Sequence, residues 1–327
     1  MRVGVVGAGF IGAVHLGAYA NIPEAEVVGV ADARPEIAEA GAAVVGARPY
    51  ASYEELVAAE DVEVVDICLP TAYHRALALK AAQDGRNVIV EKPLARNLED
   101  AEAIIDAFSG VGGRLFVGHV VRFFPEYAKI KAMIDAGELG TVGVVRTSRR
   151  SPFLTGWNDW YADRRMSGGL LLDLVIHDFD FLRWSLGEVE RVYARGVLGR
   201  EYNRLDYALV TLRFAGGAIA HVEGQWGYPG PFNYSIEVGG SRALVSVDST
   251  EPAPVELLGG AIGAGESPDV AVGKSPYQTE LEHFLHCIAT REGSLVEPSD
   301  AYESLRIGLA ATEAATTGRP VTLAAFR

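Results

Sequence analysis

The chain has 327 residues, of which 49% are hydrophobic and 22% are charged, a balance that excludes wholesale disorder. A chain of this length is long enough for two domains with a core in each. It carries 43 Asp and Glu residues against 29 Lys and Arg residues, giving a formal net charge of −14. Because the basic residues are scattered through so acidic a chain, we expect neither a nucleic-acid partner nor binding to a membrane surface.

Cysteine content and hydropathy point to a cellular compartment. The two cysteines, Cys68 and Cys287, are too few for a disulfide framework and lack metal-ligand spacing. No apolar run approaches the length of a membrane span, and the N-terminus becomes glycine-rich too soon for a signal peptide. We therefore expect a soluble cytoplasmic protein.

The first 120 residues alternate short apolar runs with Ala-rich helical stretches. Strands are predicted at 3–6, 27–31, 64–69, 87–90 and 115–118. Helices are predicted at 11–21, 35–44, 53–59, 76–84 and 98–108. This alternation indicates a doubly wound α/β domain over residues 1–120, with a parallel sheet covered by helices on both faces.

After residue 120 the strands follow one another with few helices between them. Strands are predicted at 142–148, 189–197, 206–214, 218–226, 234–239, 243–247, 254–258 and 320–323. Helices are predicted at 125–136, within 168–184, at 279–290 and at 299–317. Glycine-containing turns between consecutive strands predict a mostly antiparallel sheet, and hence an α+β domain over residues 121–327.

A glycine-rich segment, GAGFIG at residues 7–12, matches the pattern G-x-G-x-x-G. It follows a predicted strand, opens a helix, and is followed 20 residues after Gly12 by Asp32 at the end of the second strand. In such a motif Gly7 permits the tight turn, Gly9 lets the backbone approach a pyrophosphate, and Gly12 lets helix and strand pack closely. A glycine turn without a ligand is the alternative, but the agreement of strand, turn, helix and acid favours a dinucleotide site.

The acid at the end of the second strand bears on the choice of cofactor. Asp32 can accept hydrogen bonds from ribose hydroxyls and repel a 2′-phosphate, which favours NAD over NADP. Arg34 is close enough in sequence to pair with a 2′-phosphate if Asp32 turns away. We therefore expect NAD, with NADP as the less favoured cofactor.

Two segments carry residues suited to proton chemistry. Lys92 follows the strand 87–90 in Glu91-Lys92-Pro93, at the carboxyl end where ligands bind an open parallel sheet, although a solvated Glu-Lys pair is the alternative. Asp173 and His177 are four residues apart on a predicted helix, so that the carboxylate would orient the imidazole as a general base. A buried histidine satisfied by its helix neighbour is equally compatible with that segment.

These motifs, in this order and spacing, resemble those of the Gfo/Idh/MocA oxidoreductase family. The resemblance extends over essentially the whole chain, and includes PTAYH at 70–74, RFFP at 122–125 and GRPV at 318–321. It implies a Rossmann domain followed by a domain built on a large, mainly antiparallel sheet. It also implies NAD(P)-dependent hydride transfer at a carbinol or carbonyl carbon of a sugar, cyclitol or sugar derivative.

Site residues carry over at matched positions. The resemblance implies that Lys92, Asp173 and His177 form the catalytic group: His177 takes the hydroxyl proton, Lys92 hydrogen-bonds the same oxygen, and Asp173 orients a partner or binds a neighbouring hydroxyl. Expected cofactor contacts are Gly7, Gly9, Phe10, Ile11, Gly12, Asp32, Arg34, Leu69, Pro70, Thr71, His74, Glu91 and Lys92. Expected substrate contacts are Lys92, Arg122, Trp157, Asp173 and His177. Thr71 stands where the family often has Asn.

Other readings of the chain stay open. An NAD-dependent glycosidase-type hydrolase of the same superfamily and a non-catalytic dinucleotide-binding sensor are the alternative functions. His221, Glu223 and Gln225 alternate onto one face of a strand, which is better explained by a polar sheet face than by a metal site, and no metal is expected. The partners expected are a small polyhydroxylated substrate and further copies of the chain, in a homodimer or homotetramer formed through the C-terminal sheet.

Overall fold

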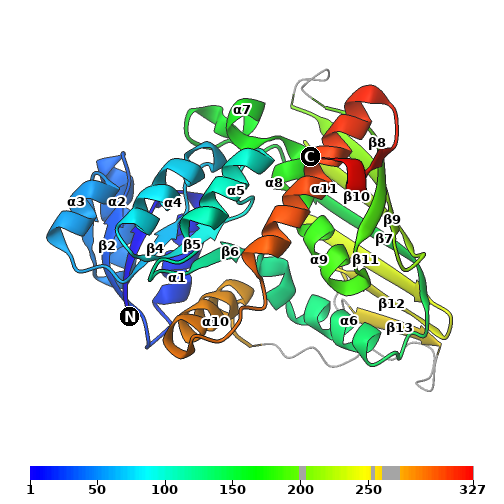
Figure 1. The fold of residues 1–327 in the computed structure, drawn as a ribbon, viewed down its shortest axis with the longest axis horizontal. Helices are drawn as coiled ribbons and strands as arrows, with labels where there is room; N and C mark the ends of the chain where they lie inside the picture. The colour runs from blue at the N-terminus through cyan, green and yellow to red at the C-terminus, as the bar shows by residue number, and fades with distance from the viewer. Residues whose placement is uncertain (199–203, 252–254, 260–272, 327) are drawn as a thin grey trace.

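The computed structural model describes residues 1–198, 204–251, 255–259 and 273–326 (Figure 1). Its first sheet has six parallel strands in the order β3-β2-β1-β4-β5-β6. They are β1 (Arg2–Val6), β2 (Glu26–Ala31), β3 (Arg48–Tyr50), β4 (Val64–Ile67), β5 (Asn87–Glu91) and β6 (Leu115–Gly118). The doubly wound domain predicted from the alternating pattern is thereby confirmed. Only β3 escaped prediction, because three partly exposed residues with a central proline carry no strand pattern.

Five α-helices connect these strands, and local sequence explains where several of them begin or end. They are α1 (Phe10–Tyr19), α2 (Pro35–Val45), α3 (Tyr53–Ala59), α4 (His74–Gln83) and α5 (Leu98–Ala107), with the short 3-10 helix η1 (Thr71–Tyr73) before α4. The side chains of Ser52 and Asn97 cap α3 and α5 by accepting hydrogen bonds from backbone N–H groups in the first turn. Gly46 ends α2 in the left-handed conformation.

The second sheet has eight strands in the order β13-β12-β11-β7-β10-β9-β8-β14. They are β7 (Val142–Ser151), β8 (Val189–Val197), β9 (Asp206–Phe214), β10 (Ile219–Trp226), β11 (Asn233–Gly240), β12 (Ala243–Asp248), β13 (Val255–Gly259) and β14 (Val321–Thr322). Neighbouring strands are antiparallel except β7 and β10, which run parallel. The mostly antiparallel sheet predicted from the turns is confirmed.

The helices of the second half are arranged around and between the two sheets. They are η2 (Val120–Phe123), α6 (Pro125–Asp135), η3 (Trp157–Ala162), α7 (Arg164–Ser167), α8 (Leu170–Asp173), α9 (Ile176–Leu186), α10 (Pro276–Thr290), α11 (Pro298–Thr317) and η4 (Leu323–Ala325). In Figure 1 α9 and α11 lie between the two sheets. Helix α10 packs on the first sheet, where Leu281 and Phe284 share a core with Val3 and Val5. Segments far along the chain therefore complete the core of the first domain.

The helix predicted within residues 168–184 is two helices, which corrects the sequence analysis. Helix α8 ends at Asp173 and α9 begins at Ile176. The break occurs because the N–H of Val175 bonds the carbonyl oxygen of Leu170, five residues back, instead of the carbonyl four residues back. Asp173 and His177 therefore do not share one face of a continuous helix.

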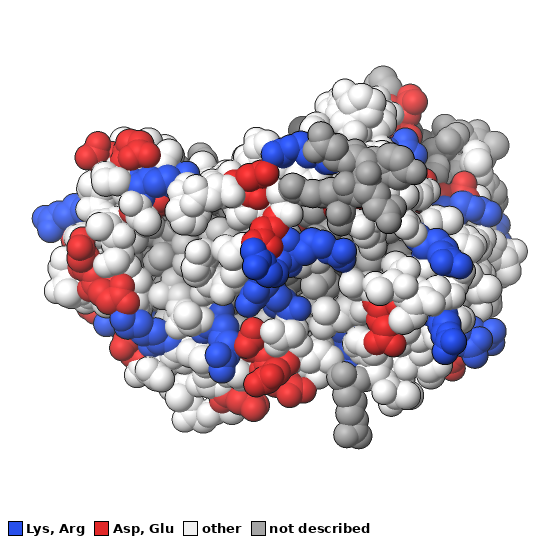
Figure 2. All heavy atoms as spheres, turned by 90° about the horizontal axis from the view of Figure 1, so that it is seen from above, with Lys and Arg blue, Asp and Glu red and all other residues white. Residues whose placement is uncertain are grey.

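The charge distribution on the surface and the length of the helices are relevant to binding of nucleic acids and membranes. On the face drawn in Figure 2, Lys and Arg side chains are interspersed with Asp and Glu side chains. Among the described helices, none is both long and apolar enough to cross a bilayer.

Candidate active site

A cavity of about 1230 Å³ opens at the carboxyl ends of the parallel strands and continues against the second sheet. Its wall combines the glycine-rich turn after β1, the ends of β2, β4 and β5, and residues from β7, η3, α8 and α9. Lys92, Asp173 and His177 all line it, as do Gly7, Gly9 and Asp32. The fold therefore brings the predicted nucleotide motif and the predicted catalytic residues to one cavity. In the strand order β2-β1-β4-β5, Asp32 and the glycine-rich turn lie toward one end of this sheet edge and Lys92 toward the other.

The glycine-rich turn has the shape that a pyrophosphate requires. Gly7 has φ +94°, and a Cβ there would lie 2.6 Å from the carbonyl oxygen of Cys68. A Cβ on Gly12 would lie 1.9 Å from the carbonyl oxygen of Gly7, so Gly12 serves the packing of α1 and is not itself in the cavity wall. Gly9 borders open space, where a Cβ would meet only the Arg34 guanidinium, at 3.9 Å.

The first turn of α1 completes this cradle. No side chain caps the helix, and no acidic residue stands in its first turn. Its leading N–H groups and the positive end of its dipole are thus available to an anion beside Gly9. Phe10 and Ile11 line the cavity at the same place. The residues present fit the pyrophosphate of a dinucleotide.

Asp32 follows the last residue of β2, and its carboxylate accepts four hydrogen bonds. Its carboxylate accepts from the backbone N–H groups of Ala8 and Arg34, each at 3.0 Å, and from the Arg34 guanidinium at 2.9 and 3.0 Å. Burial alone would raise the pKa of Asp32, but the bonds from Arg34 and Ala8 outweigh it, and the pKa is lowered. Asp32 is therefore an ionised carboxylate on the cavity wall, and the charge of Arg34 is already paired.

The loop after β4 borders the nucleotide end. Of the cofactor contacts expected here, Leu69, Pro70 and Thr71 line the cavity, whereas His74 does not. The two ring nitrogens of His74 lie 2.8 Å from the carbonyl oxygen of Leu69 and 3.0 Å from that of Pro93. His74 thus ties the loop after β4 to the loop after β5, from a position outside the cavity wall in which a cofactor contact was expected.

Lys92 is fixed at the catalytic end by Asp173. Its Nζ donates to the backbone carbonyl of Asp173 at 2.6 Å and to Oδ1 of the same residue at 3.3 Å. Both side chains are largely buried. An ammonium group has three donors, so two contacts to Asp173 leave one for a ligand.

A buried histidine holds the strand end that carries Lys92. His15 on α1 places Nε2 3.1 Å from Glu91 Oε1 and Nδ1 2.8 Å from Asp66. Burial alone would lower the pKa of His15, but Cys68 and Asp66 outweigh it and raise the pKa well above its ordinary value. Glu91 also accepts a hydrogen bond from the backbone N–H of Lys92. His15 thus joins α1 to the end of the strand that carries Lys92.

His177, at the start of α9, is set up differently from the sequence expectation. Asp173 bonds Lys92 rather than the imidazole. The wider turn at Val175 separates Asp173, the last residue of α8, from His177 in α9. Nδ1 of His177 is buried and has no hydrogen-bond partner among the described residues. Burial lowers the pKa of His177 well below its ordinary value, and the charges of Lys92 and Arg149 lower it further. The imidazole is therefore neutral near neutral pH and able to accept a proton.

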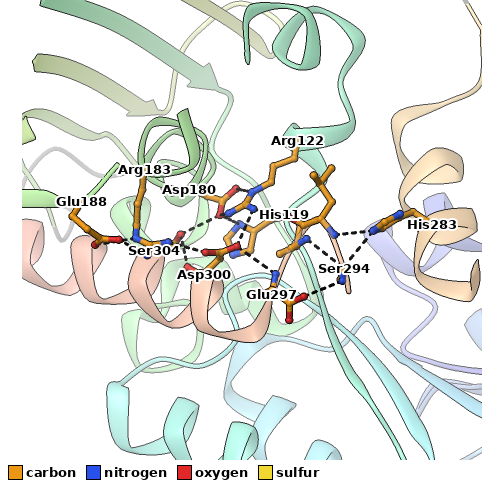
Figure 3. A network of polar contacts seen from close by, with 12 residues as sticks. His119, Arg122, Asp180, Arg183, Glu188, His283, Ser294, Glu297, Asp300 and Ser304 are labelled. Atoms are coloured by element: carbon orange, nitrogen blue, oxygen red, sulfur yellow. Dashed lines mark hydrogen bonds and ion pairs between the residues drawn. The ribbon is translucent and has the colours of Figure 1, made fainter. Parts of the chain in front are cut away.

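Arg122, an expected substrate contact, is not among the residues that line the cavity. Its side chain is 1% exposed and forms a two-pronged ion pair with Asp180 of α9 (Figure 3). Trp157, another predicted substrate contact, does line the cavity and is 43% exposed.

Sequence reasoning did not find Arg149, which lies in the cavity wall, close enough to His177 for its charge to lower the pKa of that imidazole. Its Nε donates to Asp178 at 2.8 Å, and burial and this ion pair distinguish it from the more exposed Arg150 next to it. The sequence TSRR at 147–150 contains no signal that separates the two arginines.

The comparisons with known proteins fit this geometry. An oxidoreductase family described by its NAD-binding Rossmann fold matches residues 1–119, and the GFO/IDH/MocA C-terminal domain matches residues 127–246. The chain belongs to the Gfo/Idh/MocA oxidoreductase family. The resemblance stated from the motifs, the fold and NAD as the cofactor are thereby confirmed, and the chain is an enzyme of this family of NAD-dependent sugar- and inositol-type dehydrogenases.

Two relatives and one solved structure illustrate the similarity. The scyllo-inositol 2-dehydrogenase (NAD(+)) of Bacillus subtilis (strain 168) is 31% identical over 345 residues, covering 99% of this chain and 96% of the relative. The inositol 2-dehydrogenase of Rhizobium meliloti (strain 1021) is 31% identical over 337 residues, covering 99% of each. The WlbA dehydrogenase of Bordetella pertussis, solved with NADH and UDP-GlcNAcA, superposes with a TM-score of 0.88 at 26% identity, covering 98% of this chain and 97% of that one.

Proposed function

We propose that this enzyme transfers hydride between NAD and a carbinol or carbonyl carbon of a cyclitol or sugar, with Lys92, Asp173 and His177 as the catalytic group. The observation that carries the proposal is the convergence of Lys92 and a neutral His177 on one cavity whose other end is the dinucleotide motif. When bound, NAD supplies the nicotinamide carbon that takes up hydride.

The protein's part in the oxidation is to move one proton and to stabilise one oxygen. His177 accepts the proton of the reacting hydroxyl through its neutral imidazole. Lys92 directs its remaining donor at the same oxygen and stabilises the negative charge that develops there. Asp173 holds the ammonium group by its carbonyl and its carboxylate, so that Lys92 acts from a fixed position. In the reverse direction His177 returns the proton.

The substrate class follows from the wall of the catalytic end and from the relatives. Trp157 offers an exposed apolar ring on which the C–H face of a cyclitol or sugar can stack, and Asp173 can accept from a second hydroxyl. Two relatives similar over nearly the whole chain are named as inositol 2-dehydrogenases. An inositol is accordingly the first substrate to test.

The nucleotide end favours NAD over NADP. Asp32 stands where the adenosine ribose binds in this fold, and its carboxylate repels a 2′-phosphate. Arg34 donates both its Nε and a terminal nitrogen to Asp32, so its charge is not free to bind that phosphate.

The outer face of the second sheet supports the prediction of a homodimer or homotetramer. Along β8, β9 and β10 the side chains alternate between buried and exposed, and the exposed side includes Tyr193, Leu209 and Ile219. Helices α8 and α11 pack on these strands, from the buried side. The exposed apolar side chains on the other side suit contact with a second copy of the chain.

The proposal is tested by measuring NADH formation with a panel of inositols, polyols, aldoses and sugar phosphates, using NAD and NADP in parallel. We expect turnover with a cyclitol or sugar, and faster turnover with NAD than with NADP. If NAD binds but no member of the panel gives NADH, and no corresponding carbonyl compound is reduced with NADH, the proposal is contradicted and the sensor is favoured. Cleavage of a glycoside with no net NADH would favour the hydrolase.

A further inference from the structure

An ion pair outside the cavity joins the two halves of the catalytic site. Arg122 lies in η2, the segment that follows β6, and Asp180 lies in α9, three residues after His177. Nε of Arg122 donates to Asp180 Oδ2 at 2.8 Å, and a terminal nitrogen donates to Oδ1 at 2.6 Å. Both side chains are 1% exposed, so the pair is removed from solvent screening.

Neighbouring groups complete the bonding of this pair, as Figure 3 shows. The other terminal nitrogen of Arg122 donates to the carbonyl oxygen of Leu295 at 2.7 Å and to Asp300 at 3.0 Å. Ser304 Oγ donates to Asp180 at 3.2 Å. Burial alone would lower the pKa of Arg122, but Asp180 and Asp300 outweigh it and raise the pKa, so the guanidinium stays charged. A fully bonded buried pair has one geometry rather than several.

The location of η2 relates this pair to Lys92. Strands β5 and β6 are parallel neighbours, with Glu91 opposite Gly118. Lys92 follows Glu91 directly, and η2 begins two residues after Gly118. The segment that carries Arg122 therefore leaves the same edge of the first sheet as Lys92.

The imidazole of His177 depends on its helix for its position. Nδ1 has no hydrogen-bond partner in the described part of the chain, so no side-chain contact of that atom fixes the ring. The placement of α9 must therefore set the position of His177. The Arg122–Asp180 pair connects that helix, one turn beyond His177, to the sheet edge that carries Lys92.

We propose that Arg122 and Asp180 are positioning residues, which set the distance and orientation of His177 relative to Lys92 without contacting the substrate. This inference rests on the proposed function of His177 as proton acceptor. Since a displacement of about 1 Å in a catalytic group can cost a factor of about 100 in rate, loosening the pair acts on turnover.

The test compares two arginine-to-lysine variants. Arg122→Lys keeps the charge but cannot form the two-pronged contact with Asp180. Arg114→Lys is the matched control, because Arg114 connects the start of the same strand β6 to the carbonyl oxygens of Cys287 and Glu292, away from α9. Both variants are assayed with NAD and the polyol of highest turnover, at a temperature where circular dichroism shows each to be folded.

We expect Arg122→Lys to lower kcat by a factor of about 10 to 100. We expect the Kd of NAD to stay unchanged and the isotope effect of a substrate deuterated at the reacting carbon to increase, because hydride transfer becomes the slow step. Arg114→Lys lowers the unfolding temperature and leaves kcat and the isotope effect unchanged. Equal kcat values in the wild type and folded Arg122→Lys would overturn the proposal.

A readout without substrate separates this inference from the proposed function. In crystal structures of the NAD-bound variants, the distance between Lys92 Nζ and the His177 ring changes in Arg122→Lys and stays as in the wild type in Arg114→Lys. An unchanged distance in Arg122→Lys overturns the positioning role. If the wild type oxidises no polyol, the proposed function fails, and this distance still decides the structural part of the inference. Asp180→Asn, which keeps the shape of the side chain, is the second variant if Arg122→Lys does not fold.

Discussion

The two ends of the cavity are built in different ways. The nucleotide end uses residues between 6 and 80, from consecutive strand–helix units, and depends on backbone groups at the start of α1 and on one carboxylate. The catalytic end combines side chains of residues 91–92, 149–161 and 173–177 with single residues as distant as Tyr277. The nucleotide end depends mainly on the backbone conformation of a short motif. The catalytic end forms only when the two domains pack together.

The largest effect is expected from removing the side chains proposed to be catalytic. Lys92→Ala and His177→Ala should each lower kcat by a factor of about 10² to 10⁴, because one loses the stabilising charge and the other the proton acceptor. The Kd of NAD should remain nearly unchanged, since the backbone cradle at the other end is intact. Steady-state kinetics and NAD titration measure the two effects separately.

The control for that experiment is Lys131→Ala, which removes a partly exposed ion pair with Asp135 on α6, outside the cavity. It should leave kcat as in the wild type. Unaltered kcat in both Lys92→Ala and His177→Ala would contradict the assignment of the catalytic group.

The nucleotide end is tested by Asp32→Ser. A hydrogen bond to a charged group contributes about 1.5–3 kcal/mol, so its loss should weaken NAD binding by about 10- to 100-fold. The same change frees Arg34 from its ion pair, so the Kd for NADP should fall relative to that for NAD. In the double variant Asp32→Ser, Arg34→Gln the gain for NADP should disappear. An NADP preference that persists in the double variant would show that Arg34 is not its source.

The pH dependence sharpens the account of the catalytic end. Since burial lowers the pKa of His177, the free enzyme keeps a neutral imidazole down to a pH below the ordinary histidine value. The kcat/KM for oxidation should therefore stay level as the pH falls through about 6.5, and then decrease about tenfold per pH unit below the lowered pKa. A half-maximal point at or above the ordinary histidine pKa would contradict the burial argument.

The smallest expected effect is that of Trp157→Ala. Loss of one stacking face of about 1 kcal/mol should raise the KM of the polyol about fivefold, while kcat and the Kd of NAD change little. Kinetics with the polyol and NAD varied in turn measure this. A decrease in kcat with an unchanged KM would indicate that Trp157 positions the catalytic residues rather than binding the substrate.

Sequence-based prediction succeeded at the nucleotide end of the cavity and was incomplete at the catalytic end. The turn at Gly7 and the packing at Gly12 could be predicted because each leaves no room for a Cβ, so residue type and backbone geometry correspond directly. The spacing of Asp173 and His177 predicted a contact between them on one continuous helix. It could not show that the N–H of Val175 bonds the carbonyl of Leu170 and interrupts that helix. The two-domain pattern was likewise visible, but the return of α10 to the first core was not.

The sequence by itself determined the parallel and antiparallel sheets, the dinucleotide motif and the candidate catalytic residues, because periodicity, turn residues and motif spacing are properties of neighbouring residues. Only the tertiary structure decided that Asp173 bonds Lys92, that burial lowers the pKa of His177, and that Arg122 bonds Asp180 rather than lining the cavity. These outcomes depend on burial and on partners 58 to 81 residues away along the chain, and local patterns contain no information on either.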